Sequence, residues 1–144
     1  MTNPHRSHSN SASSQAGFET ALQEFDDALR DRRSQDIMDL FAEDCKALIH
    51  HQDTIVGRDA VGEAFRRYFD VFPTSAYAPD YDVVDVVGDR AYVLGSFQET
   101  LRPSSSGPLT RVFGRVVLFW SRIEGKWLVT RLLTARSSPE QIGE

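Results

Sequence analysis

The sequence predicts an α+β domain in which helices come first and a meander of long antiparallel strands follows. Hydrophobic residues recur at helical spacing over residues 18–72, and they alternate with polar residues over residues 81–136. Gly88-Asp89 and Glu124-Gly125 interrupt the alternating half, as tight hairpin turns do. Because 144 residues suffice for one core, we expect a single sheet packed on three helices.

The three predicted helices follow from their apolar faces and their capping residues. The first covers residues 18–30, the second begins at Ser34 as its N-cap, and the third begins near Asp59 and ends before Pro73. The apolar stripe of the first helix consists of Phe18, Ala21, Leu22, Phe25, Ala28 and Leu29. Its acidic residues are expected mostly off that stripe: Glu19, Glu24, Asp26 and Asp27.

The predicted strands begin after the second helix. Residues 45–51 form a strand with which residues 54–56 pair back, before the third helix. The second half predicts further strands at residues 81–87, 90–101, 109–123 and 126–136. Helices followed by such a meander give the α+β class.

Both ends of the chain are expected to lie outside the domain. Residues 1–16 are polar and Ser-rich, which is typical of a disordered leader, and residues 137–144 predict a flexible tail, so the domain covers residues 17–136. No apolar run reaches the roughly 20 residues of a membrane helix, and no secretory signal opens the chain. We therefore expect a cytoplasmic protein without membrane contact. The single cysteine, Cys45, excludes an intramolecular disulfide and a cysteine zinc cluster.

The charge of the chain is unevenly distributed. Its net value of −5 argues against general nucleic-acid binding. Residues 17–89 hold 17 acidic and 7 basic residues, whereas residues 90–136 hold 8 basic and 2 acidic residues. Either the two halves attract each other or meet water, or a pocket or interface is tuned for an anionic ligand.

The last hairpin allows the two faces of the sheet to be assigned. With a two-residue turn at Glu124-Gly125, Ile123 pairs with Lys126 and Leu118 lies opposite Arg131. One face then collects residues that are almost all apolar: Val112, Gly114, Val116, Leu118, Trp120, Trp127, Val129, Arg131 and Leu133. We expect this face to pack on the helices and to line a pocket. A one-residue bulge would exchange the two faces.

Arg131 is the one charged residue well inside that apolar face. Since a buried guanidinium needs a partner, Arg131 either pairs with a carboxylate such as Glu99 or clamps the carboxylate, enolate or phosphate of a ligand. The opposite face mixes arginine with large apolar side chains, which suits a homodimer interface. Its residues include Arg111, Phe113, Arg115, Phe119 and Leu132.

Alternation along the strand at residues 45–51 places His51 inside, because Lys46 should face water. Histidine is a general base near neutral pH, although a hydrogen-bonded structural histidine is the alternative. Because the adjacent His50 points to the other side of the strand, we expect no shared metal. Tyr68 on the third helix is either a hydrogen-bond donor to a ligand or a core aromatic with its hydroxyl at the rim.

The order of several short motifs resembles the SnoaL-like branch of the nuclear transport factor 2-like superfamily over residues 18–135. The motifs are Phe41-Ala-Glu-Asp44, Gly57-Arg-Asp59, Gly88-Asp89 and Gly125-Lys-Trp127. The resemblance implies a cone-shaped, curved mixed or antiparallel sheet on three helices with one central pocket, usually in a dimer. Members include isomerases, polyketide cyclases, epoxide hydrolases, dehydratases and domains without demonstrated catalysis, so the fold does not determine the function.

The resemblance also shows where known catalytic groups are missing. A gapless match to ketosteroid isomerases puts Phe25 at their tyrosine donor and Ile49 at their aspartate base, and neither side chain can replace those groups. A one-residue shift would bring His50 to the base position.

Two functions remain open from the sequence. The first is a cofactor-free isomerase, cyclase or dehydratase for a mainly apolar carbonyl or carboxylate compound, with His51 as base, Arg131 as anion stabiliser and Tyr68 as donor. The second is a non-catalytic ligand-binding or dimerisation module; a protein-interaction domain that uses the basic, aromatic sheet face is a third reading. The expected pocket lining is Phe25, Ile49, Phe65, Leu118, Trp120, Trp127 and Glu99.

Overall fold

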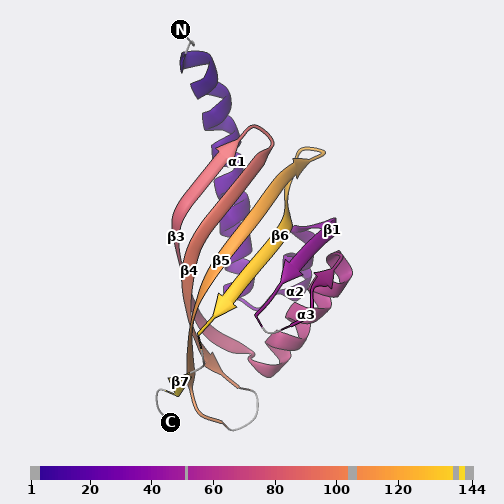
Figure 1. The fold of residues 1–144 in the computed structure, drawn as a ribbon, viewed down its shortest axis with the longest axis vertical. Coiled ribbons are helices and arrows are strands. Elements are labelled where there is room, and N and C mark those ends of the chain that lie inside the picture. The colour runs from indigo at the N-terminus through magenta and orange to yellow at the C-terminus, as the bar shows by residue number, and fades with distance from the viewer. Residues whose placement is uncertain (1–3, 51, 104–106, 138–139, 142–144) are drawn as a thin grey trace.

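A curved mixed sheet with helices on its concave side forms the molecule (Figure 1). The computed structural model describes residues 4–50, 52–103, 107–137 and 140–141. The sheet has seven strands in the order β2-β1-β6-β5-β4-β3, and β7 pairs with β5. This architecture confirms the predicted α+β class.

The helices are α1 (Pro4–Arg30), α2 (Ser34–Asp39) and α3 (Arg58–Val71). The first helix begins at Pro4 and not near Phe18, so the Ser-rich segment expected to be disordered has helical backbone where it is described. The segment extends the helix that begins the domain, so no new helix has to be nucleated. The composition of the segment alone does not show this advantage. The expected caps also differ, because Arg33 precedes α2 and Gly57, with φ of 95°, precedes α3.

The strands agree best with the prediction in the second half of the chain. They are β1 (Phe41–Leu48), β2 (Ile55–Val56), β3 (Thr74–Val87), β4 (Arg90–Arg102), β5 (Thr110–Ile123), β6 (Lys126–Arg136) and β7 (Glu140–Gln141). β1 begins at Phe41 and not at the predicted residue 45, because the chain pairs in parallel with β6 from Phe41 onward. β3 begins before the predicted residue 81, and it carries Pro79 because it is an edge strand.

A bulge in β6 exchanges the faces of its second half. The predicted pairs Ile123–Lys126 and Trp120–Val129 are present, but Phe119 then pairs with Arg131 because Thr130 is the extra residue. The Thr130 hydroxyl donates a hydrogen bond to the Phe119 carbonyl across this irregularity, at 3.2 Å. One additional residue reverses the direction of every later side chain.

The predicted inward orientation of Arg131 is therefore wrong. Arg131 and Leu133 are exposed on the outer face of the sheet, whereas Leu132 is buried. The outward position spares the Arg131 guanidinium the cost of desolvation, which would be several kcal/mol.

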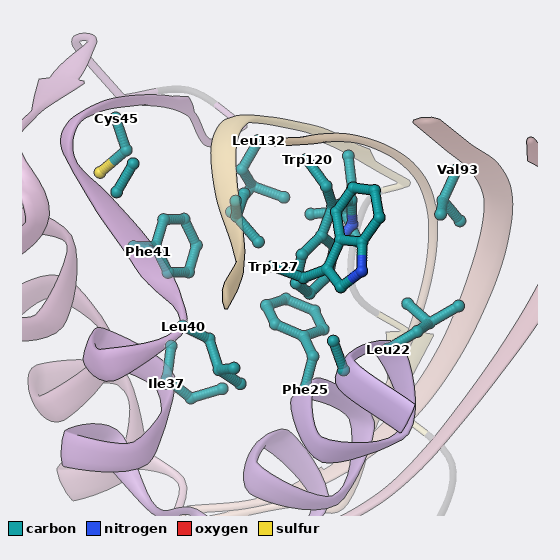
Figure 2. Close-up of a cluster of buried hydrophobic side chains, with 14 of the residues drawn as sticks. Leu22, Phe25, Ile37, Leu40, Phe41, Cys45, Val93, Trp120, Trp127 and Leu132 are labelled. Atoms are coloured by element: carbon teal, nitrogen blue, oxygen red, sulfur yellow. The ribbon is translucent and has the colours of Figure 1, made fainter. Parts of the chain in front are cut away.

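The core lies between α1, α2 and the sheet (Figure 2). Phe18 packs edge-to-face on Trp120 at 5.2 Å and on Trp127 at 5.3 Å between ring centroids, and Phe25 reaches Trp120 at 5.9 Å. Such edge-to-face pairs add to the burial of the rings. The six residues of the predicted α1 stripe all belong to this core or pack against it. No helix within the described residues is long and apolar enough to cross a membrane.

Candidate functional site

A cavity of about 120 Å³ lies where α1 and α3 face the sheet. Its wall is mainly apolar, with polar groups from few positions. The lining residues are Phe25, Leu29, Ile49, Gln52, Ala64, Phe65, Tyr68, Tyr77, Phe97, Glu99, Val116, Leu132, Thr134 and Arg136. An apolar cavity with a few converging polar groups is the usual form of a small-molecule site.

The structure divides the expected lining residues into two groups. Phe25, Ile49, Phe65 and Glu99 line the cavity. Leu118, Trp120 and Trp127 are instead buried in the core beside Phe18 and Phe25. They occupy the predicted face of the sheet, but they pack against α1 and do not line the cavity.

Glu99 on β4 is the buried carboxylate of the cavity, with 5% of its surface exposed. Its Oε2 lies 3.1 Å from Nη2 of Arg32, in the turn between α1 and α2, and its Oε1 accepts a 2.7 Å hydrogen bond from the Tyr68 hydroxyl. The Arg32 guanidinium also lies over the rings of Tyr68 and Phe69, at 5.2 and 4.8 Å from their centroids. A buried carboxylate requires such a charged partner, and that partner is Arg32, not Arg131 as one reading of the sequence proposed.

Tyr68 serves mainly to hold Glu99 in place. Burial raises the pKa of Tyr68, and the neighbouring negative charge of Glu99 raises it further. A phenol carries one proton, and in this geometry that proton is donated to Glu99. The ring of Tyr68 lines the cavity, but its hydroxyl has no second hydrogen for a ligand.

Arg136 at the end of β6 supplies the cation that the sequence placed at Arg131. The Thr130 bulge that turns Arg131 outward also turns Arg136 toward the cavity, which it lines. Its guanidinium carbon is 6.0 Å from the centroid of the Tyr68 ring. Among the described residues, no carboxylate lies within ion-pair distance of Arg136.

The balance of charge in the cavity wall follows from these pairs. Glu99 is paired with Arg32, and no described carboxylate pairs with Arg136, so Arg136 adds a positive charge to the cavity wall. A guanidinium in this position can hold a carboxylate or stabilise an oxyanion. Arg131 cannot do so, because it is exposed on the other face and donates to the Thr130 carbonyl at 2.7 Å.

A second polar cluster reaches the cavity from α1 and β3. Asp26 has 7% of its surface exposed, and it accepts a 2.5 Å hydrogen bond from the Tyr81 hydroxyl. The hydroxyl of Tyr77 lies close enough to that of Tyr81 for the two groups to act on each other's pKa, and Tyr77 lines the cavity. Burial raises the pKa of Asp26 to about 6, although Tyr81 and the charge of Arg30 lower it in part.

This second cluster was not predicted from the sequence, although a signal for it exists there. Asp26 lies four residues after Leu22 and three before Leu29, so it belongs to the apolar stripe of α1 and not to the polar face where it was expected. Tyr77 was missed because β3 was predicted to begin only at residue 81. An acidic residue inside an apolar stripe is the observation that would have identified the cluster.

The histidine predicted as the base, His51, lies outside the described residues, and its role stays a prediction. His50 is half-buried, and its Nδ1 accepts a 3.3 Å hydrogen bond from the backbone N–H of Arg136. Ile49 and Gln52, which flank the two histidines in the sequence, both line the cavity.

Two other chemistries receive no support from the described residues. Cys45 is fully buried, and burial together with Asp44 raises the pKa of its thiol, which makes it a poor nucleophile. Within the described part of the chain, no three His, Cys, Asp or Glu side chains gather as metal ligands would.

Solved structures with the same fold include proteins related to several enzymes. A candidate scytalone dehydratase from Novosphingobium aromaticivorans DSM 12444 is 16% identical, with a TM-score of 0.81 over 94% of this chain and 92% of its own. A ketosteroid isomerase-like protein from Erwinia carotovora atroseptica SCRI1043 is 19% identical, with a TM-score of 0.77 over 86% and 96%. A hexachlorocyclohexane dehydrochlorinase from Novosphingobium barchaimii LL02 is 10% identical, with a TM-score of 0.79 over 92% of each chain.

At these identities the likeness concerns the fold alone. No curated protein sequence matches the chain. The family of SnoaL-like domains matches residues 21–132, which include α2, α3 and every strand from β1 to β5. The protein therefore belongs to the SnoaL-like domain family and has the nuclear transport factor 2-like fold.

Proposed function

We propose that the protein binds a small, mainly apolar molecule with a carboxylate or carbonyl group and promotes its cofactor-free isomerisation, cyclisation or dehydration. The observation that carries this proposal is the position of Arg136, which adds a cation without a described carboxylate partner to an otherwise apolar cavity wall. Its alternative is a protein that binds the same molecule without transforming it.

The proposed chemistry needs a base, a stabiliser of negative charge and a dry site. Removal of a proton beside a carbonyl leaves an enolate, and Arg136 is placed to stabilise its oxygen. Return of the proton to another carbon completes an isomerisation. A dehydration is completed when an acid gives a proton to a neighbouring hydroxyl, which departs as water. We retain His51 as the proposed base, because its sequence neighbours Ile49 and Gln52 line the cavity.

Binding is tested first with 2-naphthoate, a flat apolar anion, in a thermal-shift experiment. We expect 2-naphthoate to raise the melting temperature of the wild-type protein and of Arg131→Gln, but not that of Arg136→Gln. Arg131→Gln is a matched control, because both arginines are on β6 but only Arg136 lines the cavity. Loss of the effect in Arg131→Gln with retention in Arg136→Gln would refute the proposed site.

Turnover is tested with 2-acetonaphthone, which has the same ring system and exchangeable protons beside its carbonyl. In D₂O, the wild-type protein should accelerate exchange of the methyl protons, as followed by NMR, and His51→Gln should lose this acceleration. Binding of the ketone with exchange at the solvent rate would favour the non-catalytic alternative.

We also propose that the outer face of the sheet joins two copies of the chain. An apolar row crosses five strands in register on that face, at Val83, Leu94, Val117, Leu133 and Leu48. Four of these side chains have more than a third of their surface exposed, at 36% for Val83 and Leu94, 44% for Leu133 and 48% for Leu48. A continuous exposed apolar row of this kind is typical of an interface.

The charges beside the row suit a twofold partner. On the β3 side lie Asp80 and Asp85, whereas Arg131 and Lys46 lie on the β6 and β1 side. A second copy turned by a twofold axis would bring acidic strands over basic ones. Leu133→Glu should convert the dimer to monomers in light scattering, whereas Val87→Glu, at the tip of the β3–β4 hairpin, should not. A monomeric wild-type protein would refute the interface.

A further inference from the structure

Asp26, Tyr81 and Tyr77 form a chain of neighbouring polar side chains that begins at a buried carboxyl and ends in the cavity wall. The Tyr81 hydroxyl donates to Oδ1 of Asp26 at 2.5 Å, and the Tyr77 hydroxyl is the next polar group of the row, near enough to Tyr81 for the two to act on each other's pKa. Asp26 comes from α1, and both tyrosines come from β3, so the packing of one helix on one edge strand assembles the chain.

The buried carboxyl of this chain has a different environment from that of Glu99. Glu99 is paired with a guanidinium, whereas no described Lys or Arg lies within ion-pair distance of Asp26. The charged groups that act on Asp26 are Arg30 and Asp27, both on α1, and from β3 the neutral Tyr81 hydroxyl donates a hydrogen bond to it. A buried carboxyl that is held mainly by a neutral phenol gains and loses its proton more readily near neutral pH than an exposed one.

We propose that Asp26, Tyr81 and Tyr77 act as a proton relay whose direction sets whether the cavity end of the chain accepts or donates a hydrogen bond. The inference rests on the proposed function, because it names the acid of the same cavity. Its ligand is an oxygen acceptor, either the carbonyl of the bound molecule or the hydroxyl that departs in a dehydration.

The direction of the relay follows from counting protons, since each hydroxyl carries one. When Asp26 is a carboxylate, Tyr81 donates to it, Tyr77 donates to Tyr81, and the oxygen of Tyr77 can only accept in the cavity. When Asp26 is protonated, it donates to Tyr81, Tyr81 donates to Tyr77, and Tyr77 donates to the ligand oxygen. If the ligand oxygen takes the proton of Tyr77, each donor is reprotonated by the next, so that Asp26 ends as a carboxylate and no further reactant is needed.

The coupling along the chain is tested by NMR with tyrosine labelled with ¹³C at Cζ, without any ligand. We expect the Cζ resonances of Tyr77 and Tyr81 to shift together as the pH passes through about 6. Both shifts should disappear in Asp26→Asn, and the resonance of Tyr92 should not follow this titration. A titration seen at Tyr81 but not at Tyr77 would overturn the relay, because the chain would then stop short of the cavity.

The cavity end of the relay is tested with the neutral ketone 2-acetonaphthone, whose own charge does not change with pH. Because one hydrogen bond contributes about 0.5–1.5 kcal/mol, the wild-type protein should bind the ketone roughly 2- to 10-fold more tightly at pH 5 than at pH 8. Tyr77→Phe and Asp26→Asn should each remove this pH dependence.

Tyr92→Phe is the matched control for this experiment. Tyr92 donates a 2.5 Å hydrogen bond to Asp85, which copies the Tyr81–Asp26 pair on the outer face of the sheet, away from the cavity. The Tyr92→Phe variant should bind the ketone as the wild-type protein does, with the same dependence on pH. Equal affinity of the wild type at both pH values would overturn the relay but leave the cavity site intact. Absence of ketone binding at either pH would overturn the proposed function, and the NMR titration would then decide the relay alone.

Discussion

Replacement of Asp26 by asparagine should stabilise the protein at neutral pH but not at acidic pH. Burial raises the pKa of Asp26 from an ordinary value of 3.8 to about 6. Between these two values the folded protein binds the proton more tightly than the unfolded chain, so the stability of the wild type falls as the pH rises from about 4 to about 6. Above about 6 the loss is complete. Asparagine has nearly the same shape, keeps an oxygen for the Tyr81 hydroxyl, and does not ionise.

The magnitude follows from the size of the shift. A difference of about two pKa units corresponds to about 3 kcal/mol, at 1.36 kcal/mol per unit. We therefore expect Asp26→Asn to have nearly the stability of the wild type below pH 4 and to exceed it by up to about 3 kcal/mol at pH 8. This gain is large for a single substitution, since most substitutions destabilise a protein by about 0.5–3 kcal/mol.

The assay is urea unfolding between pH 3.5 and 8, followed by the fluorescence of the buried Trp120 and Trp127. Asp27→Asn is the control, because Asp27 is the next residue of α1 and 44% of its side chain is exposed. Its effect should stay within a few tenths of a kcal/mol and should change little over this range, as for other exposed ion pairs. If the free energies of unfolding of Asp26→Asn and the wild type changed with pH in the same way, the argument would be refuted, because burial would then not raise the pKa of Asp26.

Two other substitutions test the packing around the cavity. Arg32→Met leaves Glu99 buried without its cation and should destabilise the protein by about 3–5 kcal/mol. The double variant Arg32→Met/Glu99→Leu should recover most of this loss in the same urea assay. If Arg32→Met alone were as stable as the wild type, the buried ion pair would be contradicted. Gly95→Ala places a Cβ 2.5 Å from the backbone oxygen of Asp80 and should cost about 1–3 kcal/mol through displacement of β3. Its control is Gly125→Ala, where a Cβ meets open space and only the positive φ should cost stability, by about 1 kcal/mol. If both variants lost the same free energy of unfolding, the tight approach of β3 and β4 would be contradicted.

Local patterns in the sequence predicted much of the fold. The apolar stripe of α1, the turns at Gly88 and Gly125 and the bounds of β6 depend on residues near in sequence, and the structure has them where they were expected. The start of β1 could not be predicted in this way, because Phe41 becomes part of a strand through its pairing with Val129. Pairing between residues so far apart in the chain leaves no periodic signal in either segment.

The candidate site was predicted only where alternation or helical spacing remains regular. Phe65 and Tyr68 on α3 and Glu99 on β4 lie in such regular segments, and all three line the cavity. Asp26 also lies in a regular helix, where its polarity predicts exposure but its spacing predicts burial, and it is buried. The helical spacing therefore predicted the buried position of Asp26 correctly. The sequence did not show that this spacing outweighs the polarity of the residue.

The positions of Arg131 and Arg136 show how a local irregularity in a strand determines which of two arginines lines the cavity. Both arginines are available on β6, five residues apart, so without a bulge the strand's alternation of faces would place one inside and the other outside. Thr130, as one extra residue, selects Arg136, which enters the cavity at the end of the strand where His50 meets its backbone. At this end a guanidinium reaches the cavity wall without crossing the packed core around Trp120. If Arg131 faced inward, its guanidinium would lie closer to that core. Desolvation of the charge there would cost several kcal/mol without a partner to offset this cost. The bulge thus puts the Arg136 guanidinium in the cavity wall, where none of the described carboxylates pairs with it.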